Sequence, residues 1–178
     1  MTSNKETRSG SKSLEELIEL AEQHIRDIFF VEKLEGFAPL WYLVSKHKGQ
    51  DCVVLTPWDG DLEKEHCVNK VKELAHSIEA EALCFSTECW MLDIKEGSRQ
   101  ERLNERPSES PNRIEAVLII AHGFDGADAK RLRKRTIAKS LRMIRDKPGG
   151  RLIALENYGD MGDGTTYDSW MLRGMIRP

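Results

Sequence analysis

Two carboxylates lie in two strand-like runs that follow one another along the chain. Glu88 lies within "EALCFSTECWMLDI", and Glu115 lies near the start of "RIEAVLIIAHGF". Two carboxylates that lie close together raise the pKa of one of them, which suits general acid–base catalysis. With His122 at the end of the second run, these residues are the candidates for a hydrolase or nuclease site.

The alternation of side chains along a strand favours a structural role for the same residues. Glu88 lies on the smaller, more polar face of its run, and His122 and Glu115 project from opposite faces of theirs, so one flat strand cannot direct both into one pocket. If the second run presents Arg113 to the face that carries Glu88, the two form a cross-strand ion pair. We favour this structural pair over catalysis.

Motifs for other kinds of chemistry are absent from the sequence. The serines lie in no G-x-S-x-G context, and neither a P-loop nor a G-x-G-x-x-G pattern occurs. Cys84 and Cys89 are five positions apart and lack the C-x2-C spacing of zinc ligands, while Asp160 and Asp163 lack the EF-hand spacing. We therefore expect no metal, no cofactor and reduced cysteines.

A basic stretch is the strongest functional signal in the sequence. Residues 127–147 contain nine Lys or Arg and two Asp, a local charge of +7 in a chain of net charge −3, which leaves −10 elsewhere. Such a stretch binds phosphates, an acidic partner or the acidic remainder of its own chain. It contains no aromatic residues for base stacking, and we favour a solvated face or an internal role over nucleic-acid binding. The candidate contact residues are Lys130, Arg131, Arg133, Lys134, Arg135, Lys139, Arg142 and Arg145.

The elements that position these residues follow from the pattern of the remaining chain. Ser13 and Glu16 form a capping box at the start of a strongly amphipathic helix. "EGFAPLWYLVSK" and "DCVVLTPW" flank a turn at Gly49 and predict a β-hairpin, which precedes a second helix from Leu62. The segment from Ala127 fits a helix in part, but its end also fits a hairpin over 136–158.

Length and composition indicate one folded domain over residues 13–178. We expect a flexible tail at 1–12 and a mobile charged loop at 95–112. The longest apolar runs fall far short of the roughly 20 residues of a membrane-spanning helix, and the polar N-terminus lacks a signal-peptide pattern. The expected location is the cytoplasm.

The sequence around Glu88 also resembles a known group of proteins. "STECW" followed by "RPSESPNRIEAVLIIA" is similar to uncharacterised bacterial and phage-associated proteins whose strands contain S-E-A-W and then P-S-E-x-P-x-R-x-E. Cys89 departs from this pattern, which has Ala there. The resemblance supplies no activity, but it implies that the two runs pair, that Glu88 contacts Arg113, and that the chain after "DG" forms further strands. The matching positions are Ser86 or Thr87, Glu88, Trp90, Pro107, Ser108, Glu109, Pro111, Arg113 and Glu115.

Together these observations predict an α+β fold, with a mostly antiparallel sheet of five or six strands and two main helices packed against it. The expected function is that of a non-enzymatic binding or regulatory protein, derived from a mobile element, that acts through protein–protein contacts. The first alternative is a nucleic-acid-associated protein that uses residues 130–145. The second is a hydrolase or nuclease that uses Glu88 and Glu115. No membrane partner is expected, and the sequence leaves the oligomeric state open.

Overall fold

The computed structural model describes residues 12–47, 49–92, 107–110, 113–124 and 134–161, together with 172, 175 and 176. The predicted tail at 1–12 and charged loop at 95–112 lie outside these residues, apart from Lys12 and residues 107–110. Lys130, Arg131 and Arg133 of the basic stretch also lie outside them. In chain order the elements are α1 (Leu14–Arg26), η1 (Asp27–Val31), β1 (Leu40–Ser45), β2 (Cys52–Leu55), α2 (Asp61–Ser77), β3 (Ala80–Leu92), η2 (Pro107–Glu109), β4 (Arg113–Phe124), β5 (Lys134–Arg145) and β6 (Leu152–Met161).

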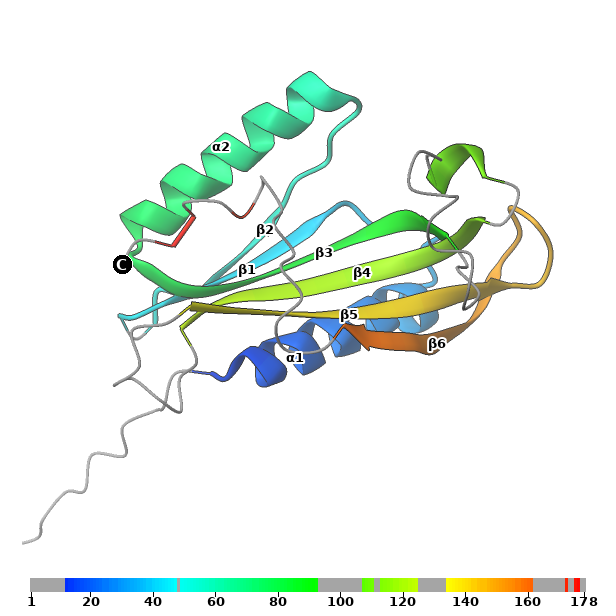
Figure 1. Cartoon of the computed structure of the whole chain (residues 1–178), viewed down its shortest axis with the longest axis horizontal. Helices are drawn as coiled ribbons and strands as arrows, with labels where there is room; N and C mark the ends of the chain where they lie inside the picture. The colour runs from blue at the N-terminus through cyan, green and yellow to red at the C-terminus, as the bar shows by residue number, and fades with distance from the viewer. Residues whose placement is uncertain are drawn as a thin grey trace, which may run out of the picture.

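The strands form one six-stranded sheet in the order β2-β1-β3-β4-β5-β6 (Figure 1). Every neighbouring pair is antiparallel. The predicted α+β fold is confirmed, as is the pairing of the two runs that contain Glu88 and Glu115, which are β3 and β4. The basic stretch forms β5, a strand, over its described part.

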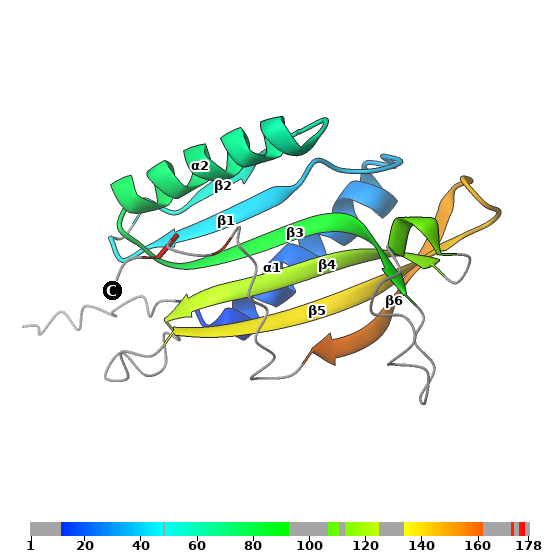
Figure 2. The same ribbon diagram turned by 45° about the horizontal axis from the view of Figure 1, so that its top comes forward.

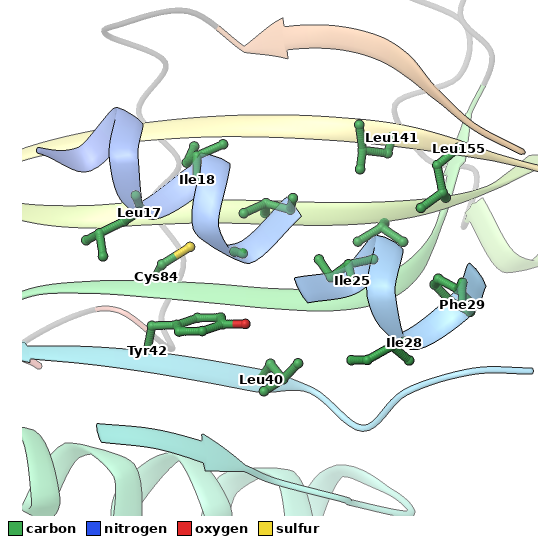
Figure 3. Close-up of a cluster of buried hydrophobic side chains, with 14 of the residues drawn as sticks. Leu17, Ile18, Ile25, Ile28, Phe29, Leu40, Tyr42, Cys84, Leu141 and Leu155 are labelled. Carbon is green, nitrogen blue, oxygen red and sulfur yellow. The ribbon is translucent and has the colours of Figure 1, made fainter. Parts of the chain in front are cut away.

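Helix α1 covers one face of the sheet. The predicted capping box at its start is present, with the Ser13 and Glu16 side chains each accepting a hydrogen bond from the other's backbone N–H. One further turn, the π-helical η1, continues α1 towards β1. Figure 3 shows the apolar stripe of the helix against strand residues such as Tyr42, Cys84 and Leu141. This first core fixes which strand residues point towards α1.

Helix α2 packs on the opposite face, over β1 and β3 (Figure 1). Trp41 and Phe85 form the centre of this second core, with ring centroids 4.3 Å apart, and the Trp41 indole donates to Thr56 Oγ1 over 2.9 Å. The α2 residues in this core are Val68, Val71 and Ala75, and it also holds Leu172, Met175 and Ile176 from near the C-terminus. No helix in the described residues is long and apolar enough to cross a membrane.

Candidate functional site

Glu88 of β3 joins its strand to the segment that precedes β1. Its Oε1 accepts a hydrogen bond from the backbone N–H of Phe37 over 2.8 Å. A Cβ at Gly36 would lie 2.9 Å from the same oxygen, so a larger residue there would displace the Glu88 carboxylate. Burial raises the pKa of Glu88 above its ordinary value, and the nearby charge of Glu115 adds to the rise, while the Phe37 hydrogen bond and Arg145 oppose it. Burial is the largest of these effects and the charge of Glu115 the smallest, so the rise does not depend on a pair of carboxylates.

The predicted partner of Glu88, Arg113, lies further along the strand. Glu88 is opposite Val117 in the β3–β4 register, and Arg113 is opposite Leu92. The guanidinium of Arg113 lies 4.6 Å from the centroid of the Trp90 ring and donates to the carbonyl of Ser108. Glu88 and Arg113 lie on the same face of the sheet, but the β3–β4 register offsets them by four positions, so they do not form the predicted ion pair. In the described part of the chain, each has another partner.

Glu115 forms an ion pair with Arg145, and this contact links β4 to the end of β5. Arg145 also donates to the carbonyl of Gly150 over 2.9 Å, in the turn between β5 and β6. The carboxylate of Glu115 is thus held by a cation, and it is opposite Trp90 in the sheet register. This arrangement positions the end of β5 and leaves Glu115 poorly suited to be a catalytic base.

His122 lies on the other face of the sheet. It is opposite Leu83, in the core under α2, whereas Glu88 is opposite Val117, in the core under α1. Its Nδ1 lies 2.8 Å from Thr136 Oγ1, and burial, together with the charge of Lys134, lowers its pKa. The sheet therefore separates the catalytic candidates. In the described residues, no three His, Cys, Asp or Glu side chains gather in a way that would hold a metal ion.

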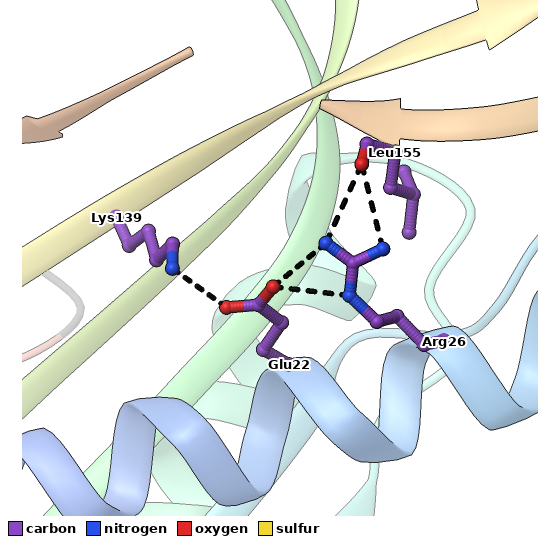
Figure 4. Close-up of polar contacts among 4 residues, drawn as sticks. All are labelled: Glu22, Arg26, Lys139 and Leu155. Atoms are coloured by element: carbon purple, nitrogen blue, oxygen red, sulfur yellow. Dashed lines mark hydrogen bonds and ion pairs between the residues drawn. The ribbon is translucent and has the colours of Figure 1, made fainter. Parts of the chain in front are cut away.

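Two cations of the basic stretch, Arg135 and Lys139, pair with acidic residues of α1. Lys139 Nζ lies 2.7 Å from Glu22 Oε2, and Arg135 Nη2 lies 3.4 Å from Glu15 Oε1. Figure 4 shows that Glu22 also binds Arg26, whose guanidinium donates to the Leu155 carbonyl. This agrees with the interpretation that the basic stretch neutralises acidic residues of its own chain.

The sheet splits at the end where Arg142 and Arg145 lie. The β3–β4 pairing continues to Leu92 and Arg113, and the β5–β6 pairing continues to Arg145 and Leu152. The β4–β5 pairing, in contrast, ends at Ala116 and Arg142. The Cα register of the β5–β6 pairing shifts by one residue at Tyr158 and again at Ile153, and bulges of this kind bend and twist a hairpin. In Figure 2 the β5–β6 hairpin turns away from the ends of β3 and β4.

A cleft of about 740 Å³ lies at this split. Four cations line it against two carboxylates, so its lining is net positive. Arg142 and Lys147 are exposed, whereas Arg113 and Arg145 are held by the contacts described above. Trp90 is 41% exposed at the same place. The lining residues are Trp90, Arg113, Ile114, Glu115, Arg142, Met143, Arg145, Asp146, Lys147, Pro148 and Gly149.

A second cavity of about 520 Å³ lies at the opposite end of β3 and has a different character. Its charged lining includes Lys46, Glu79 and Glu81, and Lys46 already forms an ion pair with Glu79. The split end is therefore the better candidate for a site that recognises charge. Sequence reasoning found Arg142 and Arg145 but missed Trp90 and Lys147 as site residues, because nothing in the sequence shows where the β4–β5 pairing ends.

Comparisons of the chain with protein-family models, with curated proteins and with solved structures gave no match. The evidence on what this chain binds therefore comes from the residues of the cleft itself. Fixed guanidinium groups, exposed cations and a partly exposed indole suit the binding of an anionic group, since charge-assisted hydrogen bonds to arginine are strong and directional.

Proposed function

We propose that this chain is a non-enzymatic binding protein that engages an acidic segment of another protein through the cleft between β4 and β5. The observation that carries the proposal is the split in the sheet, which gathers Arg113, Arg142, Arg145 and Lys147 around Trp90. Tryptophan and arginine are the residues that most often dominate binding at protein interfaces. The cleft combines both types.

The charge distribution supports an acidic partner at this place. The chain as a whole has a net charge of −3, and the described cations near α1 lie against Glu15 and Glu22. At the cleft, Glu115 neutralises Arg145, and Asp146 is the one other carboxylate among the described lining residues, which also include Arg113, Arg142 and Lys147. An acidic segment would thus be attracted to the positive cleft and repelled by the rest of an acidic molecule, which favours binding at the cleft over non-specific binding elsewhere on the surface.

Single-stranded nucleic acid is the second candidate ligand, and one observation favours it. The basic stretch has no aromatic residue of its own, but the fold brings Trp90 of β3 beside Arg142 and Arg145 of β5. A base could stack on that indole. Against this candidate, Arg113 already lies over the Trp90 ring, and two cations of the stretch, Arg135 and Lys139, pair with α1.

The hydrolase alternative receives no comparable support. Glu88 accepts a backbone hydrogen bond, Glu115 is held by Arg145, and His122 lies on the other face of the sheet.

The proposal is tested by fluorescence anisotropy with a labelled polyglutamate peptide and a labelled oligothymidylate of equal charge. We expect polyglutamate to bind more tightly, with an affinity that falls as salt rises from about 20 mM to about 300 mM, because exposed charges are screened over about one Debye length. Arg142→Glu is expected to weaken this binding about tenfold or more. Arg151→Glu is the matched control, because Arg151 is exposed in the same hairpin but is not among the cleft residues.

Two results would contradict the proposal. Equal weakening by Arg142→Glu and Arg151→Glu would mean that polyglutamate senses only overall charge. Tighter binding of oligothymidylate, lost on Trp90→Ala, would establish the nucleic-acid candidate instead.

A further inference from the structure

We infer that the acidic segment binds in an extended conformation, as an added strand on the edge of β5 at Met143–Arg145. This inference rests on the proposed function and specifies how the same cleft recognises its partner. It concerns the backbone of β5, whereas the proposed function depends on the side chains that line the cleft.

The edge of β5 is available because its two neighbours end at different places. On one side β5 pairs with β6 as far as Arg145. On the other side the pairing with β4 ends at Arg142, so within the described residues positions 143–145 have no ladder partner there. Such an edge is a ready template for an extended peptide, whose main chain supplies the hydrogen bonds.

The facing edge of β4 is a poorer template. The short helix η2 contacts both β3 and β4 at this end. The N–H of Arg113, the first residue of β4, already donates to the carbonyl of Ser110 over 3.3 Å. We therefore assign the added strand to β5.

The side chains along this edge predict a pattern in the ligand. Arg142 is opposite Ala116, on the α2 side of the sheet, and Arg145 is opposite Leu152, which belongs to the core on the α1 side. The unmatched residues of the bulges belong to β6, so β5 keeps its regular alternation. Residues of a paired strand share the face of the residue opposite. Position 142 is itself paired with Ala116, so a ligand strand can pair only with 143–145, and the next ligand residue leaves the ladder beside Arg142. A ligand therefore presents acidic side chains to both arginines when they are three positions apart, one opposite Arg145 and one just beyond the residue opposite Met143.

The two positions between these arginines are apolar, since Met143 and Ile144 lie there. The ligand pattern is accordingly acidic, apolar, apolar, acidic. Arg145 already binds a carboxylate, that of Glu115, so the ligand carboxylate at this position replaces an existing contact of the same chemistry.

Anisotropy with synthetic peptides tests the inference on the intact chain. The parent peptide has a Glu-Val-Val-Glu core between Gly and Ser residues, and a composition-matched isomer has Glu-Glu-Val-Val. Two further peptides each carry one backbone N-methyl group, on the first or on the second Val. Successive N–H groups of a strand point to opposite sides. Strand addition therefore predicts that only one of the two methylated peptides loses affinity, by about tenfold, and that the isomer binds about tenfold more weakly than the parent.

Arg142→Glu should remove the preference for the parent peptide over the isomer, and the control Arg151→Glu should retain it. The inference is overturned if the isomer and both methylated peptides bind as tightly as the parent. In that case the proposed function would still hold if acidic peptides bind in a salt-dependent manner and Arg142→Glu weakens that binding. If no acidic peptide binds at low salt, both the inference and the proposed function are wrong.

Discussion

The contact between Glu88 and Phe37 predicts opposite effects for two substitutions at the same position. Glu88→Ala removes the only acceptor that the described residues place at the Phe37 N–H, over 2.8 Å, and leaves that donor in a partly buried place. An unsatisfied buried donor costs about 1 to 3 kcal/mol. For a chain of this length, that lowers the melting temperature by about 2 to 4 °C for each kcal/mol.

Glu88→Gln keeps an oxygen acceptor at the same place and removes the charge. Burial raises the pKa of Glu88 above its ordinary value of 4.5. Protonated Glu88 therefore favours the folded state, a contribution that is fully present below pH 4.5 and is lost as the pH rises through the raised pKa. Relative to the natural protein, the glutamine variant should gain stability as the pH rises from 4.5 through this raised pKa.

Urea unfolding of both variants at acidic and neutral pH measures these effects. We expect Glu88→Gln at neutral pH to match or exceed the natural protein, and Glu88→Ala to be destabilised by about 2 kcal/mol. If glutamine destabilises the protein as much as alanine at neutral pH, Glu88 depends on a cationic partner. The reasoning from the Phe37 contact would then be wrong.

Two further predictions concern stability. Gly123→Ala should destabilise the protein by about 3 kcal/mol, because the added Cβ would lie 2.4 Å from the Glu81 carbonyl oxygen at a φ of +147°. The control Gly149→Ala, also at positive φ but in open space, should cost about 1 kcal/mol. Equal losses of stability in thermal unfolding would refute the steric cause. A double-mutant cycle with Glu22→Gln and Lys139→Met should give a coupling of about 1 kcal/mol at neutral pH. Burial alone would raise the pKa of Glu22, but its bonds to Lys139 and Arg26 lower the pKa below its ordinary value of 4.5. The coupling should therefore fade as the pH falls below 4.5 and through this lowered pKa. A coupling that does not change with pH would contradict the ion pair.

The fold was largely predictable because its elements have strong local signals. The capping box at Ser13 and the stripe of α1 need no tertiary information, and the same holds for the β-hairpin before α2. β5 was ambiguous because Leu132, Ile137, Leu141 and Ile144 partly fit a helical period. Its environment decides the outcome, since Ile137 and Leu141 face α1, and Ala138 packs in the core under α2.

The candidate site was only partly predictable, for two physical reasons. Alternation correctly placed Glu88 and Arg113 on one face, but their offset of four positions depends on the β3–β4 register, which no local pattern shows. The cleft depends on where the β4–β5 pairing stops and on bulges in β6. These features bring Trp90 of β3 close to Arg142 and Lys147 of the β5–β6 hairpin, which lie more than fifty positions further along the sequence.

The most direct test of binding at the cleft is an NMR titration of the intact chain with the Glu-Val-Val-Glu peptide. We predict that the largest shifts appear at residues 142–149 and at the Trp90 indole N–H, with little change in β2 at the far edge of the sheet. Shifts centred on β2 or on α1, with the Trp90 indole unaffected, would contradict the claim that the split between β4 and β5 is the binding site.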